Sequence, residues 1–163
     1  MIDYAGELPV EPDPAADNHR AGVGGEPLQV AALPYRVHAQ GRDILLVTSR
    51  RSNRWILPKG WPLHGTSLAQ SAAREAYEEA GVHGKIGRDD IGRFTTTKVT
   101  TEGSASFLVV VYPLEVEVEL ERWPEQLERQ RQWFALTEAR VAIAPDQRAI
   151  IDIFHALAGS FGG

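Results

Sequence analysis

The chain has 163 residues, 43% of them hydrophobic and none of them cysteine, and its formal net charge at pH 7 is −5. The length suits one domain with an ordinary core, and the lack of cysteine excludes disulfides, thiolate metal sites and a cysteine nucleophile. The net negative charge argues against general nucleic-acid binding, and no apolar run is long enough to span a bilayer. Because the N-terminus shows no secretory signal pattern, we expect a cytoplasmic protein without nucleic-acid or membrane partners.

Residues 1–27 are rich in proline and glycine, a composition typical of a flexible extension, which we expect to be an inert tail rather than a lid. We therefore place the folded domain at residues 28–163. Its first expected elements are strands at 29–38 and 44–48, which are joined by a hairpin turn at 40–43.

A helix is predicted from about Ser67 to Ala80, after a short strand at 55–57 and a glycine-containing turn. Ser67 and Gln70 have the spacing of a capping box, in which each side chain satisfies a free amide of the other residue. Gly81 is typical of a helix end. Small apolar residues at every fourth position predict a face that packs closely against a sheet: Leu68, Ala72, Ala76 and Ala80.

The second half of the domain is predicted to contain strands at 91–99 and 104–116, a short strand at 132–135 and a closing helix at 145–158. The run 107–111 contains no polar residue, which indicates a central strand covered on both faces. Together these elements predict an α/β fold in which a mixed β-sheet lies between helices, an α/β/α sandwich.

The predicted helix carries three carboxylates that its geometry brings together. Residues three and four apart are neighbours on a helix, so Glu75 lies beside Glu78 and Glu79, and Arg74 lies one turn from Glu78. Such a cluster can be an ordinary solvated helix face with an exposed ion pair. It can also be a cation site, because Mg²⁺ prefers carboxylate oxygens and commonly bridges protein to phosphate. The strand and glycine turn before the helix favour the cation site.

A pattern of fixed spacing extends from this turn to the end of the helix: Gly60, Arg74, Glu75, Glu78, Glu79, Gly81 and Val82. The pattern resembles the signature of the Nudix hydrolases, which implies a Nudix-type α/β/α sandwich. Two positions depart from it, since Thr66 occupies the place of the first glutamate and Ala76 is a small form of the first aliphatic residue. In the family that glutamate mainly supports the arginine and the loop, whereas the metal-binding acids lie on the helix.

Several shorter segments on both sides of the pattern carry a second resemblance: 43–51, 54–58, 84–88, 92–94, 121–123, 131–134 and 138–139. They are similar to the branch of the family that contains diphosphoinositol polyphosphate and diadenosine polyphosphate hydrolases. The resemblance covers roughly residues 28–158.

The resemblance implies a bound divalent metal ion, Mg²⁺ or alternatively Mn²⁺. Glu78 and Glu79 are the first candidates for direct ligands, with Glu75 as the third. A backbone carbonyl of Lys59 or Gly60 would complete the protein's share of the coordination.

The resemblance also implies that Arg74 anchors the loop and orients the glutamates. The general base is left open between Glu75, which we favour, and Glu102 in the loop of the later hairpin. Relatives use either a helix glutamate or an acid on a distant loop. Trp61 follows the glycine turn directly, and we expect it to pack under the loop rather than to stack on a nucleobase.

Basic residues near the turn predict a patch that binds a polyphosphate substrate: Arg50, Arg51, Arg54 and Lys59, with Lys98 from the later hairpin. Arginine suits phosphate because its planar fork donates two hydrogen bonds at once. The competing interpretation is that these are solvated surface cations.

The predicted function is Mg²⁺-dependent hydrolysis of a phosphoanhydride bond by metal-activated water. The substrate would be a nucleoside diphosphate derivative, a dinucleoside polyphosphate or a diphosphoinositol polyphosphate. The alternative is a non-catalytic module that senses nucleotides on the same fold, which the missing first glutamate keeps open. An exposed strand or the N-terminal extension could support a homodimer.

Overall fold

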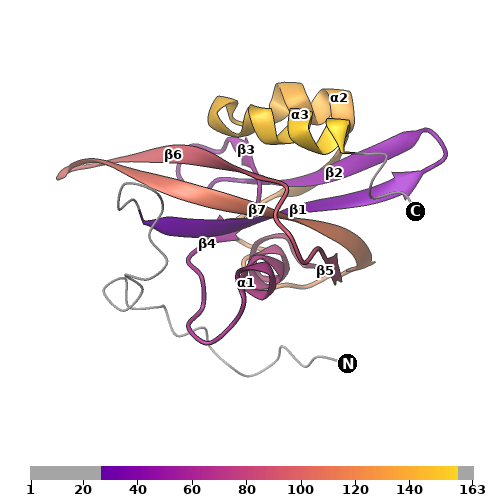
Figure 1. Cartoon of the computed structure of the whole chain (residues 1–163), viewed down its shortest axis with the longest axis horizontal. Helices are drawn as coiled ribbons and strands as arrows, with labels where there is room; N and C mark the ends of the chain where they lie inside the picture. Colours follow the sequence, from indigo (N-terminus) through magenta and orange to yellow (C-terminus); the bar gives the residue numbers. More distant parts are fainter. Residues whose placement is uncertain (1–26, 158–163) are drawn as a thin grey trace.

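The alternation of apolar residues along the chain produces a mixed β-sheet. The computed structural model describes this sheet and its helices over residues 27–157 (Figure 1). The strands are β1 Leu28–His38, β2 Gly41–Thr48, β3 Trp55–Ile56, β4 Lys59–Gly60, β5 Val82–Ile86, β6 Gly92–Thr100, β7 Gly103–Glu119 and β8 Arg131–Ala135. The helices are α1 Leu68–Glu75 with a π-helical turn at Ala76–Ala80, α2 Leu136–Ala142, a 3₁₀ turn at Pro145–Gln147 and α3 Arg148–Ala156. The predicted extension at 1–27 lies outside the described residues except for Pro27.

Strands β1 and β7 form the centre of the sheet and are its parallel pair. The order along the sheet is β3-β2-β1-β7-β5, and β4 pairs with β1, β6 with β7 and β8 with β2. Every strand pair other than β1 with β7 is antiparallel. Helix α1 covers one face, and α2 and α3 cover the other (Figure 1). This arrangement confirms the predicted mixed sheet and the α/β/α sandwich.

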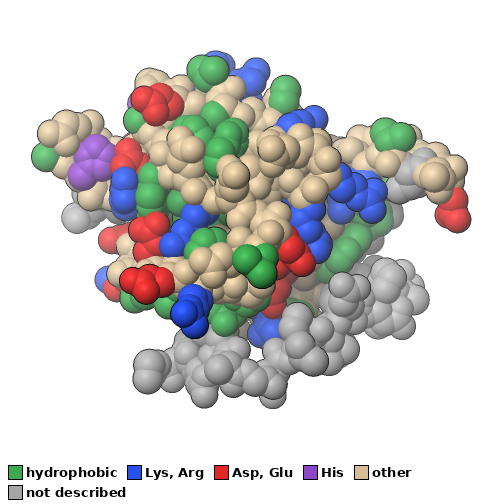
Figure 2. Space-filling view, turned by 180° about the vertical axis from the view of Figure 1, so that it is seen from behind, with side chains coloured by type: hydrophobic (Ala, Val, Ile, Leu, Met, Phe, Trp, Pro, Cys, Tyr) green, Lys and Arg blue, Asp and Glu red, His purple; other side chains and the backbone are tan. Residues whose placement is uncertain are grey.

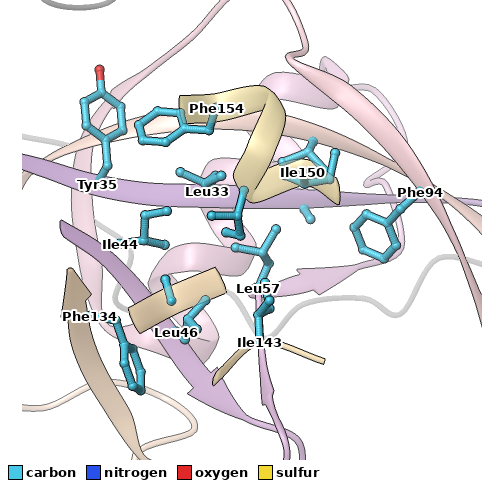
Figure 3. Packing of buried hydrophobic residues seen from close by; sticks show 14 of the residues in the cluster. Leu33, Tyr35, Ile44, Leu46, Leu57, Phe94, Phe134, Ile143, Ile150 and Phe154 are labelled. Carbon is cyan, nitrogen blue, oxygen red and sulfur yellow. The ribbon is translucent and has the colours of Figure 1, made fainter. Parts of the chain in front are cut away.

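Alternate residues of β1 face the two layers of the core, as a strand period of two requires. Val30 and Ala32 pack in the cluster that includes Ala72 of α1. Leu33 faces the opposite cluster, which includes Phe154 of α3 and is drawn in Figure 3. The glutamate-bearing helix is therefore held against one face of the sheet by small apolar side chains.

The predicted helix from Ser67 to Ala80 is confirmed in its extent but not in its form. Ser67 Oγ accepts a hydrogen bond from the backbone N–H of Gln70 at 3.1 Å, and Gly81 ends the helix at φ 67°. The chain leaves the α-helical pattern after Glu75 and makes a π-helical turn. Such turns are rare and occur frequently at functional sites.

The other predicted strands and the closing helix are present, whereas β4, β5 and α2 were not predicted. Strand β5 has the sequence Val-His-Gly-Lys-Ile, which lacks a clear apolar alternation, and it forms because β7 supplies its partner edge. Strand β4 is defined only by its pairing with β1. Within residues 27–157, no helix combines the length and apolar character that a bilayer span requires.

Candidate active site

A pocket of about 290 Å³ lies where the glutamate helix meets β1, β4 and the hairpin of β6 and β7. Most of the predicted site residues line it: Arg50, Lys59, Gly60, Arg74, Glu75, Glu78, Glu79 and Lys98. The fold therefore brings the acidic cluster and part of the basic patch to one concave surface. Arg51 and Arg54 are not among the lining residues, and Arg54 pairs instead with Asp146 at 3.7 Å.

Glu79 is the most buried of the three glutamates, with 2% of its surface exposed. Its carboxylate accepts the backbone N–H of Lys59 at 3.3 and 3.4 Å and lies 3.4 Å from the Arg129 guanidinium. Burial raises the pKa of Glu79 to about 7, against the opposing effect of Arg129. The helix and the glycine turn are thus joined directly through this side chain.

The carboxyl group of Glu75 lies against the α-carbon of Gly60. A Cβ atom at Gly60 would be 2.5 Å from the Glu75 carboxyl carbon, so the absence of a side chain at Gly60 allows the Glu75 carboxyl to take this position. Burial raises the pKa of Glu75 to about 9, and the nearby charges of Glu79 and Glu78 add to the shift.

Arg74 is bonded to Glu78 one turn further along the helix. Its Nε donates to Glu78 Oε1 at 3.0 Å, and both side chains are mostly buried. Burial raises the pKa of Glu78, and the Arg74 guanidinium offsets part of the effect. The sequence predicted that Arg74 orients the glutamates, and this contact provides a direct means of doing so for Glu78.

The donor set suits a hard divalent cation, because the pocket gathers the carboxylate oxygens of Glu75, Glu78 and Glu79. Among the described residues, no three His, Asp or Glu side chains form a ready-made metal cluster. Within these residues, Glu78 is paired with Arg74 through Oε1, and Glu79 is paired with Arg129 through Oε1.

Thr66 stands where the family pattern has a glutamate, and it braces the loop through its hydroxyl. Its Oγ1 donates to the Leu63 carbonyl at 3.1 Å and lies 2.9 Å from Ser71 Oγ. The backbone N–H of Leu63 donates to the same serine oxygen at 3.0 Å. Neutral hydrogen bonds to α1 thus hold the loop that contains Thr66, at the position where the family pattern has a carboxylate.

The basic residues that line the pocket differ in how they are engaged. Arg50 pairs with Glu128 at 3.2 Å and lies 3.9 Å from Glu125. Burial, and secondly the charge of Lys98, lower the pKa of Lys59. Neither Lys59 nor Lys98 forms an ion pair with a carboxylate among residues 27–157. These two ammonium groups are the most available to an anionic ligand.

Two further candidates from the sequence have clear positions. Glu102 is exposed at the turn between β6 and β7 and is not among the residues that line the pocket. Trp61 lines the pocket, and its ring meets Phe107 edge-on at a centroid distance of 5.3 Å. Trp61 therefore packs against the hairpin of β6 and β7.

Sequence reasoning missed pocket residues that come from distant segments. Gln29 lines the pocket from β1, and Glu125 and Arg129 line it from the connection between β7 and β8. None of the three residues lies in a segment that carries the resemblance, so the sequence offered no signal for them. Their proximity to the glutamates depends on which strands pair, and a single sequence does not show that.

Comparisons with known proteins find relatives over most of this chain. The family model described as NUDIX domain matches residues 27–154. Nudix hydrolase 18, mitochondrial, from Arabidopsis thaliana is 34% identical over 121 residues, which cover 69% of this chain and 66% of the relative. Human diphosphoinositol polyphosphate phosphohydrolase 3-alpha is 34% identical over 113 residues, which cover 68% of this chain and 65% of the relative. The chain thus spans slightly less than two thirds of the length of these curated relatives.

The fold is also similar to that of a solved structure, the C. elegans Ap4A hydrolase binary complex. The TM-score is 0.62 at 22% sequence identity, and the match covers 82% of this chain and 98% of that chain.

Proposed function

This chain belongs to the Nudix family, and from this premise we propose that it hydrolyses a phosphoanhydride bond in a small substrate with Mg²⁺ as its metal. One observation carries the proposal. Glu75, Glu78 and Glu79 of one helix line the same pocket as Lys59 and Lys98, so groups that attract a cation and groups that attract a polyphosphate face one space.

The helix glutamates would hold the ion. Glu78 and Glu79 are the proposed direct ligands, Glu75 is the third, and a backbone carbonyl of Lys59 or Gly60 completes the set. When bound, the ion neutralises phosphate charge and lowers the pKa of water. Mn²⁺ would serve the same oxygen ligands as an alternative.

The proton of the attacking water would pass to a carboxylate of the chain. Glu75 is our candidate general base, because it lines the pocket beside the glycine turn, within reach of the space that the attacking water would occupy. Glu102 is the reserve, and it would need to reach the pocket from an exposed turn. Arg74 would hold Glu78 in place through the contact already described.

The charge balance of the pocket favours a substrate with few phosphates. Its arginines are engaged by glutamates, which leaves Lys59 and Lys98 as the main ammonium groups for phosphate. On the face shown in Figure 2, acidic and basic side chains alternate without an extended basic region. We therefore propose a dinucleoside polyphosphate or a nucleoside diphosphate derivative ahead of a diphosphoinositol polyphosphate, whose many phosphates would require more cations.

The non-catalytic sensor remains the second candidate, because Thr66 replaces the first glutamate of the pattern. Against it, the loop is braced by neutral hydrogen bonds and the helix glutamates keep their positions in the pocket. A module that only binds nucleotides has no evident need for three carboxylates in one pocket.

The test is phosphate release from diadenosine polyphosphates, ADP-ribose and a diphosphoinositol polyphosphate, first with Mg²⁺ and then with a chelator. Chelator-sensitive release from the nucleotides is the expected result, and it would also identify the substrate class. Mg²⁺ binding by folded protein without release from any substrate would favour the sensor.

A further inference from the structure

The end of the glutamate helix is held from outside by the connection between β7 and β8. The last carbonyls of a helix lack partners within it and need donors from elsewhere. Here each carbonyl from Glu78 to Gly81 receives one. The donors are the Glu125 N–H to Glu78 at 3.0 Å, Trp123 Nε1 to Glu79 at 3.1 Å, Arg131 Nη1 to Ala80 at 3.0 Å and the Leu120 N–H to Gly81 at 2.8 Å.

Trp123 and Arg131 supply the side-chain part of this support and act as a unit. The Arg131 guanidinium lies over the Trp123 ring at 3.9 Å from its centroid, within the range of a cation–π contact. Arg131 Nη2 also donates to the Leu120 carbonyl at 2.6 Å. A Cβ atom at Gly81 would be 2.7 Å from both side chains, so they pack directly against the helix end.

The supported carbonyls include that of Glu79, and the supported turn is the π-helical one. A π-helical turn is less regular than an α-helix, so external donors matter more to its geometry. The direction of the Glu78 and Glu79 carboxylates follows from the backbone of this turn.

We propose that Trp123 and Arg131 are positioning residues, which hold the π-helical turn so that Glu78 and Glu79 point into the pocket. The proposal deepens the proposed function and rests on it for its catalytic consequence. Its structural consequence can be measured separately, because the turn and its hydrogen bonds exist without metal or substrate.

The experiment compares Trp123→Phe with Trp133→Phe, a matched control within the same chain. Trp133 also donates through Nε1 to a glutamate, here the Glu119 carboxylate at 3.2 Å, and it also lies under an arginine, Arg36, at 4.2 Å. Among the described residues it makes no hydrogen bond to the π-helical turn, and its acceptor Glu119 lies 3.8 Å from Arg131 Nε. The comparison therefore tests the direct hydrogen bond from Trp123 to the turn. Each variant thus loses one indole N–H and keeps a stacked ring.

Three quantities are measured on the full chain: amide hydrogen exchange of metal-free protein, Mn²⁺ affinity and steady-state kinetics. For Trp123→Phe we expect faster exchange at the amide of Gly81, weaker Mn²⁺ binding and a kcat about tenfold lower with KM nearly unchanged, since one hydrogen bond is lost. Trp133→Phe is expected to match the parent protein. Arg131→Lys, with Arg140→Lys as its exposed control, should repeat the pattern if Trp123→Phe folds poorly.

Equal exchange at Gly81 and equal Mn²⁺ affinity in Trp123→Phe and Trp133→Phe would overturn the proposal. So would a fall in melting temperature with kcat unchanged, because a merely structural role predicts that outcome. If the parent chain is inactive on every substrate, the proposed function fails. The exchange and Mn²⁺ measurements would still decide whether these residues hold the turn.

Discussion

Arg129 Nη2 lies 3.4 Å from Glu79 Oε1, and the two side chains are only 8% and 3% exposed. The same guanidinium donates through Nε to Glu125 at 3.0 Å and through Nη1 to the Thr48 carbonyl at 3.0 Å. It therefore connects the end of β2, the connection before β8 and the helix that carries the glutamates. A buried carboxylate and its cation thus link three segments that are far apart in the sequence.

Replacing Arg129 with methionine should destabilise the metal-free protein by about 3 kcal/mol, because it leaves Glu79 buried without its cation. Urea unfolding in the presence of a chelator measures the change. Adding Glu79→Gln should recover part of the loss, since the uncompensated charge is then removed. Arg140→Met is the control, because the Arg140–Asp152 pair is 53% exposed on each side and its loss should cost less than about 1 kcal/mol. Equal losses in both arginine variants would contradict the prediction.

Glu78→Gln and Glu79→Gln should each lower kcat by about 100-fold or more while the chain stays folded, because the amide cannot supply the charge that a divalent cation requires. Circular dichroism and steady-state rates with saturating Mg²⁺ provide the measurement. Glu138→Gln on the exposed side of α2 is the matched control and should keep full activity. Unchanged rates in both pocket variants would contradict the proposal that Glu78 and Glu79 are metal ligands.

Gly60→Ala should lower kcat by about 100-fold, because the new methyl group would displace the Glu75 carboxyl and small misplacements of catalytic groups have large effects. The fold should survive, since the group that must move is the end of a side chain. A double-mutant cycle with Glu75→Ala tests the cause. If alanine at position 60 acts through Glu75, it should have little further effect once that carboxylate is absent.

The stability of the chelated protein should fall as the pH rises from mildly acidic to alkaline. The pKa of Glu75 is raised from 4.5 to about 9 by burial and by the nearby Glu79 and Glu78 charges. Between these values the folded state binds more protons than the unfolded state, so the free energy of unfolding decreases with pH. The measurement is urea unfolding at several pH values across that window, with a chelator present.

Glu75→Gln isolates this contribution, because it removes the titrating group and keeps the side-chain volume. The free energy of unfolding of Glu75→Gln should depend less steeply on pH than that of the parent chain. Glu138→Gln should show the same dependence on pH as the parent chain. Identical slopes for the parent and Glu75→Gln would show that this carboxyl does not hold its proton in the folded state.

Local signals in the sequence were sufficient for most of the elements and for the acidic cluster. The Ser67 cap and the Gly81 stop were found where predicted, because each involves residues within one helical turn of each other. The predicted strands were recognised from apolar runs, and the sheet buries the residues of those runs. Strand β5 escaped detection because its pairing with β7, and not its own pattern, makes it a strand.

The sequence by itself determined that the helix glutamates share one face and follow a glycine turn, since helix geometry depends only on spacing. The same spacing places Arg74 one turn from Glu78, and the structure contains that ion pair. Only the tertiary structure decided that Arg129, fifty positions further along the chain, engages Glu79. It also decided that Trp123 and Arg131 support the π-helical turn. These contacts depend on the register of β2 with β8 and of β5 with β7, which places the connection between β7 and β8 beside the helix. Register is a property of strand pairs, and therefore no single segment contains it.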